Sequence, residues 1–266
     1  MLDYDLGWRG KCQFFFGMKN DGISAGQASP DNDNGIEADA DDNKVNSTPR
    51  SHPVIYNVTL IGNSKVTGTS DNSGIAAIQA KELTEGEIYN SIFANWRNGL
   101  NLVKSLGTGR AYPTGESWNN WFATGTTGSV SSGNGSQSLK VKCNHFVNAT
   151  NPLTVGASSG AAGTNLTAAN SSDAGISAGV EYTQFTTTDK NTVVSGNTLP
   201  GFDYTFVRSG NTFTQKNDPT PNPALSITGC PTVPVDGFFE PANYRGAFSS
   251  DYGQNWLSTW SYSQVL

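Results

Sequence analysis

Two short sequence units alternate along the first 150 residues of the chain. In one unit a short apolar strand is followed by Asn, as in residues 55–62, 88–95 and 141–148; in the other, Asn or Ser and then Gly precede an alternating strand, as in 34–38, 73–78 and 98–103. Asn and Gly can turn the chain because both tolerate the left-handed backbone conformation. Short strands that recur between such turns predict a solenoid, in which parallel strands of successive coils pair edge to edge.

The chain is therefore expected to be all-β and to form a parallel β-helix that spans residues 1–266 as a single domain. An antiparallel sandwich or jelly roll is the alternative, because insertions interrupt the repeat. Two segments rich in Gly, Ser and Thr, residues 104–138 and 151–180, are predicted to be loop insertions. Residues 224–266 concentrate aromatic side chains and are predicted to form a C-terminal cap that closes the last coil.

Charged residues make up 14% of the chain, against about 25% in a typical soluble domain. Neutral polar side chains must therefore supply most of the surface, which is typical of extracellular proteins. Lys and Arg are too few and too scattered to form a basic stripe, so nucleic-acid binding is excluded. No apolar run approaches the roughly 20 residues that a membrane-spanning helix needs, so no membrane span is expected.

Residues 2–14, residues 34–39 with 53–62, and residues 238–248 resemble a large family of secreted, cell-surface bacterial proteins. The resemblance implies a right-handed parallel β-helix of the pectate-lyase-like superfold, an extracellular location and, for most members, no assigned activity. Such segments usually form the C-terminal half of a longer chain in that family. An open first coil would invite pairing at its strand edges, so self-association there is a further expectation.

Acidic residues are concentrated at the start of the chain, where residues 1–43 hold nine of the 22 acids but three of the 16 bases. This region accounts for the whole net charge of -6. Residues two apart on a strand share a face, and neighbouring strands lie about 4.8 Å apart, so stacked carboxylates would repel one another. A Ca²⁺ ion would relieve the repulsion. The predicted ligands are Asp3, Asp5, Glu37, Asp39 and Asp41; the alternative is a solvated acidic loop.

Three aromatic residues, Trp118, Trp121 and Phe122, are a candidate ligand-binding platform for a glycan, with loop packing as the favoured alternative. No catalytic residue is assigned. Basic side chains near the acids in sequence could assist a polysaccharide lyase or glycosidase; these are Arg9, Lys11, Arg50 and His52. Two GxSxG matches, at residues 22–26 and 175–179, lack the strand and helix that a nucleophile elbow requires.

The three cysteines, Cys12, Cys143 and Cys230, allow at most one disulfide. Cys230 could reach Cys143 if the tail folds back, but the sequence does not decide the pairing. Together, these features predict a secreted or cell-surface, non-catalytic module for adhesion, glycan binding or structural assembly, stabilised by calcium. The alternatives are a polysaccharide-active enzyme that uses the acidic cluster, and a subunit of an end-to-end oligomer or filament.

Overall fold

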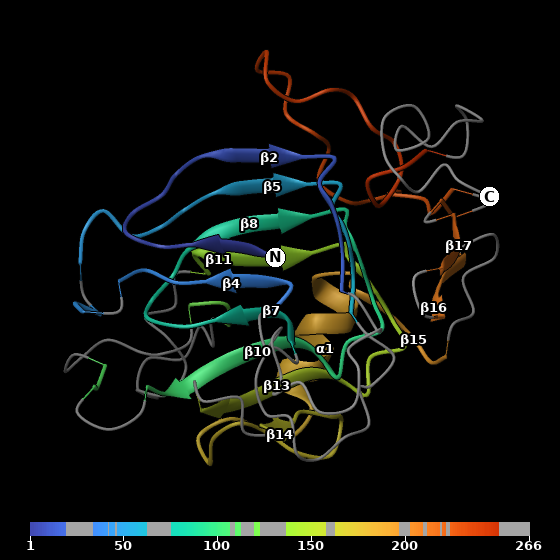
Figure 1. The fold of residues 1–266 in the computed structure, drawn as a ribbon. Coiled ribbons are helices and arrows are strands. Elements are labelled where there is room, and N and C mark those ends of the chain that lie inside the picture. Colours follow the sequence, from blue (N-terminus) through green and yellow to red (C-terminus); the bar gives the residue numbers. More distant parts are fainter. Residues whose placement is uncertain are drawn as a thin grey trace.

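The computed structural model describes residues 1–19, 34–41, 43–45, 47–62, 76–106, 110–112, 120–122, 137–157, 163–196, 203–209, 212–218, 220–221 and 224–249, and of 203–218 only the backbone. Nearly all regular structure in these residues is strand, arranged in three mainly parallel sheets (Figure 1). The prediction of an all-β chain with parallel sheets is confirmed.

The chain visits the three sheets in the same order in each of the first four coils, and the last coil has described strands in the first and third sheets. The first sheet contains β1 (Leu2–Tyr4), β4 (Ile36–Ala38), β7 (Ala76–Ala80), β10 (Asn98–Ser105), β13 (Asn151–Ala157) and the antiparallel β14 (Thr164–Asn165). The second contains β2 (Lys11–Gln13), β5 (Val54–Tyr56), β8 (Gly86–Tyr89) and β11 (Leu139–Lys142). The third contains β3 (Phe16–Met18), β6 (Thr59–Ile61), β9 (Ile92–Ala94), β12 (His145–Val147) and β15 (Thr192–Val194).

Equivalent residues of successive coils stack inside the three sheets. Ile55 pairs with Ile88, and Ile88 with Val141, which is the register that the sequence repeat predicts. In the third sheet Phe93 stacks on Phe146 at a centroid distance of 5.3 Å, and both rings are buried. Because each coil buries its inward side chains on its neighbours, the core runs the length of the stack.

The predicted left-handed Asn residues are found between the second and third sheets. Asn57 and Asn90 both have φ of 52°. In the next coil Cys143 takes this conformation, with φ of 59°, and the neighbouring Asn144 instead donates from its side chain to the Ile88 carbonyl at 3.0 Å. The turn geometry is therefore repeated even where the residue type changes.

Two details of the predicted repeat are wrong. The sequence pattern aligned Ile75 with Ile36, whereas the structure pairs Ile36 with Ile78. A shift of three residues reverses inside and outside on a strand, so the predicted register would have placed Gln79 in the core. Residues 151–157, predicted to begin a loop, form β13, which pairs with β10 because Leu153 continues the buried row of Leu100.

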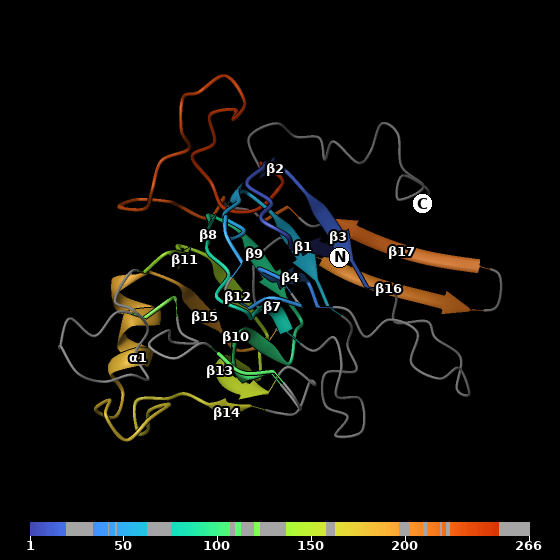
Figure 2. The same cartoon turned by 90° about the vertical axis from the view of Figure 1, so that its left-hand side faces the viewer.

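A short helical segment lies at the last coil, at the end of the stack opposite β2 (Figures 1 and 2). It consists of α1 (Val180–Thr183) and the π-helical turn η2 (Gln184–Thr188). Phe185 is fully buried and lies 5.3 Å from the ring of Phe146. This segment therefore covers the core at the last coil.

Residues 224–249, which we call the strap, run along the side of the stack instead of over its end. They contact the fourth coil through Cys143, the third through Asn90, the second through Tyr56 and the first through Gln13. The described part of the tail is thus a lateral strap, because its backbone and rings find partners at the turns between the second and third sheets, and the cap predicted for 224–266 stays a prediction. Residues 250–266 lie outside the described residues.

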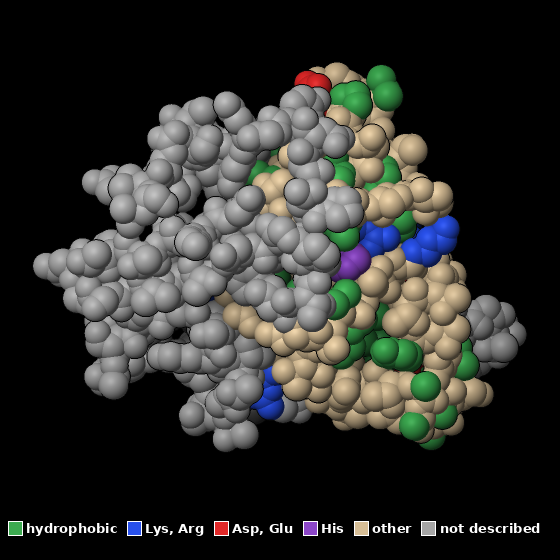
Figure 3. Space-filling view, turned by 90° about the vertical axis from the view of Figure 1, so that its right-hand side faces the viewer, with side chains coloured by type: hydrophobic (Ala, Val, Ile, Leu, Met, Phe, Trp, Pro, Cys, Tyr) green, Lys and Arg blue, Asp and Glu red, His purple; other side chains and the backbone are tan. Residues whose placement is uncertain are grey.

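The backbone of residues 203–218 forms an antiparallel hairpin of β16 (Asp203–Ser209) and β17 (Thr212–Asp218). Figure 3 shows the side of the molecule with the strap, whose described surface is mostly neutral, with apolar side chains and only small groups of charge. Among the described residues no helix is long and apolar enough to cross a membrane.

Candidate functional site

The turns that lead from the first sheet to the second are stacked by backbone hydrogen bonds. The His52 N–H donates to the Trp8 carbonyl at 2.8 Å, and the Glu85 N–H donates to the Ser51 carbonyl at 2.9 Å. The side-chain amide of Asn120 extends the stack by donating to the Thr84 carbonyl at 3.2 Å. These bonds hold the turns of four coils in register, so side chains from distant parts of the sequence meet on one surface.

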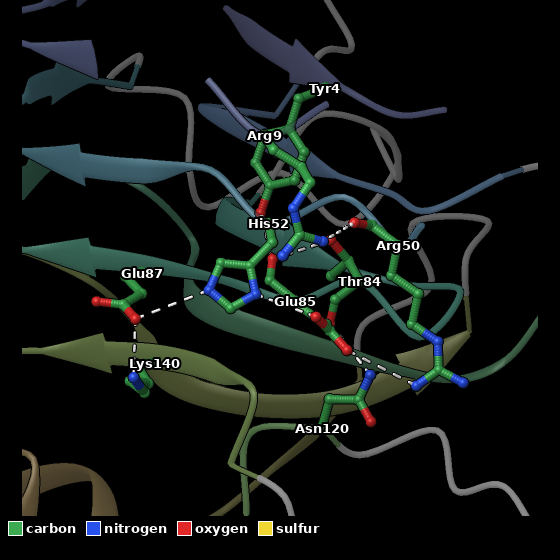
Figure 4. Close-up of polar contacts among 9 residues, drawn as sticks. All are labelled: Tyr4, Arg9, Arg50, His52, Thr84, Glu85, Glu87, Asn120 and Lys140. Atoms are coloured by element: carbon green, nitrogen blue, oxygen red, sulfur yellow. Dashed lines mark hydrogen bonds and ion pairs between the residues drawn. The ribbon is translucent and has the colours of Figure 1, made fainter. Parts of the chain in front are cut away.

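Five charged or titratable side chains meet there: Arg50, His52, Glu85, Glu87 and Lys140 (Figure 4). We call them the charged cluster. His52 Nδ1 lies 3.0 Å from Glu85 Oε2, and its Nε2 lies 3.7 Å from Glu87 Oε1. Arg50 and Lys140 flank the carboxylates, with N to O distances of 3.9 Å to Glu85 and 2.8 Å to Glu87. Basic and acidic side chains therefore alternate along the cluster.

Strand register positions Glu87 and Lys140. They are direct partners in the pairing of β8 with β11, and both point away from the core because the residues after them, Ile88 and Val141, are buried. Burial alone would raise the pKa of Glu87. The ammonium group of Lys140 outweighs this effect, and the pKa of Glu87 is lowered. Glu87 is therefore a carboxylate at neutral pH.

The His52 ring lies between two carboxylates, with Glu85 at Nδ1 and Glu87 at Nε2. The Nδ1 bond to Glu85 fixes the orientation of the imidazole, while the side chain keeps 23% of its surface exposed. A histidine oriented by a carboxylate can exchange a proton with a bound molecule, and arginine and carboxylate groups bind hydroxyls in fixed directions. The cluster can therefore bind a polar ligand and has one group suited to proton transfer.

An aromatic surface adjoins the charged cluster through the same stacked turns. Trp8 is 37% exposed, packs on Tyr4 at a centroid distance of 5.9 Å and lies over Gly10, where a Cβ atom would meet the indole ring at 2.4 Å. Arg9 donates to the Arg50 carbonyl at 3.0 Å. Gly10 therefore allows the indole to pack closely against the backbone while 37% of Trp8 stays exposed.

The predicted acidic cluster is only partly assembled. Asp3 and Glu37 are direct partners in the pairing of β1 with β4, as the stacking argument expected. Lys81, however, lies between two of the carboxylates, with Nζ 2.9 Å from Glu37 Oε1 and 3.0 Å from Asp39 Oδ2. An ammonium group thus supplies the neutralisation for which a calcium ion was predicted.

Burial dominates the titration of Asp39, which is 6% exposed. It raises the pKa of Asp39 to about 8, against the opposing effect of the Lys81 ammonium. Burial alone would lower the pKa of Lys81. The carboxylates of Asp39 and Glu37 outweigh this effect, and the pKa of Lys81 is raised. Behind this pair the fully buried Glu82 is bonded to Arg110. The network is a compensated set of charges that joins the second, third and fourth coils.

The other predicted ligands point elsewhere. Asp41 accepts hydrogen bonds from the N–H groups of Asn43 and Lys44 and from the Ser47 hydroxyl at 2.7 Å, and Asp5 is exposed. Within the described residues no three acidic, His or Cys side chains are grouped to hold a metal ion. The five residues do not converge on one ion position, and calcium binding stays a prediction.

Two of the three predicted platform aromatics belong to the core. Trp121 and Phe122 are 1% and 3% exposed, and the Trp121 indole donates to Asp189 at 3.1 Å. Trp118 lies outside the described residues. The favoured alternative, packing, is therefore correct for the two described rings, because they cover the end of the core beside Phe185.

The cysteine pairing left open by the sequence is settled by the structure. Cys143 and Cys230 form a disulfide that joins the turn before β12 to the strap. Cys12 is free and half-buried, and burial raises the pKa of its thiol.

Sequence reasoning had selected Arg50 and His52 but paired them with the wrong acids. Glu85, Glu87 and Lys140 were missed, although the repeat contained the signal for two of them. Aligning Ile55, Ile88 and Val141 also aligns the residues before them, which places Glu87 beside Lys140. Glu85 lies in a turn of irregular length and carries no such signal.

The coiled parallel sheets and stacked turns define the class of parallel β-helix proteins. Residues 1–188 match the family of pectate-lyase-like beta helix domains, and the chain belongs to this family. No curated protein and no solved structure matches the chain significantly.

Proposed function

We propose that the chain is a right-handed β-helix module that binds polysaccharide through the charged cluster and the neighbouring face of Trp8. The observation that carries the proposal is the alternation of Arg50, Glu85, His52, Glu87 and Lys140 on one partly exposed surface. Sugars offer closely spaced hydroxyls and apolar ring faces. Planar charged groups bind the hydroxyls, and an exposed indole stacks on an apolar ring face.

We propose further that the module works outside the cytoplasm, as a secreted or cell-surface protein in adhesion or structural assembly. The disulfide between Cys143 and Cys230 supports this location, because disulfides persist in oxidising compartments. The low content of charged residues, 14%, agrees with it.

Retention on immobilised polysaccharides tests the binding proposal. We expect the wild-type chain to be retained by at least one member of a panel of neutral and uronate-containing polysaccharides, and the Glu85→Gln variant to be released earlier. Lys140→Gln and Lys104→Gln form a matched pair, since their side chains are 37% and 41% exposed and each pairs with one carboxylate. Loss of retention in both variants, or in neither, would contradict the proposal.

A second candidate function is favoured by the His52–Glu85 pair, whose 3.0 Å contact orients an imidazole that keeps 23% of its side-chain surface exposed. Such a pair could act as a general base in polysaccharide cleavage. Release of reducing ends or unsaturated products from the retained polysaccharide, abolished by His52→Gln, would establish an enzyme. Retention without product establishes a binding module.

A further inference from the structure

A lysine of the third coil meets an aspartate and a glutamate of the second coil. Glu37 lies on β4 and Asp39 just after it, while Lys81 follows β7, the neighbour of β4 in the first sheet (Figure 1). Lys81 Nζ lies 3.0 Å from Asp39 Oδ2 and 2.9 Å from Glu37 Oε1. The Lys81 N–H donates to the Ala38 carbonyl at 3.0 Å. Strand pairing and this backbone bond therefore hold an amine between two carboxyl groups.

The lysine and the aspartate are the more deeply buried members of the group. The side chains of Asp39 and Lys81 are 8% and 12% exposed, against 27% for Glu37. Asp39 Oδ1 is buried and, within the described part of the chain, has no hydrogen-bond partner. Burying an ion pair removes the hydration of both groups, and an unpaired buried oxygen adds a further cost. A neutral amide in place of the two charges would remove much of this penalty.

We propose that Lys81 and Asp39 condense to an isopeptide bond, with Glu37 as the general base. Glu37 accepts a proton from the Lys81 ammonium group, and the freed lone pair on Nζ attacks Asp39 Cγ to form the N–C bond. A second proton then leaves Nζ, the Cγ–Oδ2 bond breaks, and this oxygen departs with both protons as water. One ammonium and one carboxylate thus become one amide and one water molecule, while Glu37 returns to its carboxylate form.

The contact supplies the proximity that the step needs. Reacting groups that are held together avoid the entropic cost of a bimolecular encounter, which accelerates intramolecular reactions by many orders of magnitude. Oδ2 is bonded to Cγ, so a small rotation of the Lys81 side chain brings Nζ onto the carbon that it attacks. Burial directs the bond to Asp39 rather than Glu37, because the more exposed carboxylate keeps more of its hydration.

A second lysine–aspartate pair provides an internal comparison. Lys104 Nζ lies 3.2 Å from Asp173 Oδ2, but the two side chains are 41% and 29% exposed. Water solvates both charges there, so this pair should stay ionic. The bond between Lys81 and Asp39 would join the second and third coils covalently. It is separate from the charged cluster and from the disulfide, so it does not depend on the polysaccharide proposal.

Intact mass spectrometry of the full chain, denatured and with its disulfide reduced, tests the proposal. We expect the folded wild type to become lighter than its sequence by the mass of one water molecule. Tandem spectra of the digest should show the peptide with Asp39 joined to the peptide with Lys81. An unchanged mass after prolonged incubation of the folded chain would overturn the proposal. So would a bond from Lys81 to Glu37, or one between Lys104 and Asp173.

Three variants identify the reacting groups. Lys81→Met should keep the full mass of its sequence, whereas Lys104→Met should lose one water as the wild type does. Glu37→Gln retains both reacting side chains, and we expect the bond to form at least about a hundredfold more slowly after cell-free synthesis, because the base is missing. Circular dichroism of this variant checks that its fold is intact. Loss of water in Lys81→Met would overturn the proposal, and bond formation at the wild-type rate in Glu37→Gln would overturn the role of Glu37.

Discussion

The guanidinium group of Arg245, on the strap, lies 3.0 Å from Nδ1 of His145, on β12. Burial and the charge of Arg245 lower the pKa of His145 to about 4. The buried imidazole therefore accepts a hydrogen bond from the guanidinium in its neutral form, and the contact holds the strap against the fourth coil.

Acidification should weaken this contact. The pKa of His145 is lower in the folded chain than the usual 6.5, so its contribution to stability is complete above pH 6.5 and is lost as the pH falls toward 4. The free energy of unfolding should drop by up to about 3 kcal/mol over this range through His145 alone. Urea denaturation at stepped pH checks this, and His145→Gln should flatten the dependence. An equally steep curve for the variant would contradict the assignment.

Loss of the disulfide should destabilise the chain and free the strap. The bond joins residues separated by 87 positions, for which chain-entropy arguments predict a contribution of about 4–5 kcal/mol. Guanidinium denaturation measures the free energy of unfolding of two variants. Cys230→Ala removes the disulfide, and Cys12→Ala, which removes the free thiol, is the control. We expect a loss of several kcal/mol only for Cys230→Ala, accompanied by proteolytic cleavage within residues 224–249. Equal stability of the two variants would show that the strap does not depend on the bond.

Asn57 combines a backbone and a side-chain role that two substitutions can separate. Its φ is 52°, and its side-chain amide donates to the Tyr244 carbonyl at 2.7 Å. Asn57→Gly keeps the conformation and loses this bond together with the one that Gln13 donates to Asn57 Oδ1 at 3.2 Å, at a cost of about 1–3 kcal/mol. Asn57→Ala loses the same two bonds, and the left-handed conformation should add about 1 kcal/mol. Thermal unfolding of the two variants measures the difference, and a less stable glycine variant would contradict this division.

Lys81 should be the group that keeps the acidic residues of the first coils together. Removing it as Lys81→Met leaves Glu37 and Asp39 without their shared cation, which should cost about 3 kcal/mol of stability. The matched change at an exposed pair, Lys104→Met, should cost less than about 1 kcal/mol. Equal losses in the two lysine variants would contradict the role given to Lys81. The predicted calcium site has its own test, since a chelator should lower the wild-type unfolding midpoint if the acidic residues hold an ion.

The parts of the fold that were predictable from sequence are those with regular periodicity. The aligned residues Ile55, Ile88 and Val141 gave the correct register because a two-residue alternation determines which side chains face the core. The strap was not predictable, since its contacts join residues such as Gln13 and Glu240 across 227 positions and follow no repeat. Aromatic content indicated only that residues 224–266 would pack somewhere.

The candidate site shows the same division. Asp3 and Glu37 were correctly placed on neighbouring strands, yet the position of Lys81 between Glu37 and Asp39 comes from a turn and was not visible in the strand pattern. His52 was selected from the sequence, but its partner Glu85 is 33 residues away in a turn. Strand periodicity thus predicts stacked neighbours, whereas contacts between turns require the fold itself.

The central claim is that the charged cluster is the polysaccharide-binding surface. Its most direct test is a titration, by isothermal calorimetry, of the soluble form of the retained polysaccharide into the wild type, Lys140→Gln and Lys104→Gln. The claim predicts that Lys140→Gln, which also leaves Glu87 without its closest cation, weakens the affinity by about tenfold, while Lys104→Gln stays within about twofold of the wild type. An unchanged Kd for Lys140→Gln, with heat still released on binding, would place the binding surface elsewhere and contradict the claim.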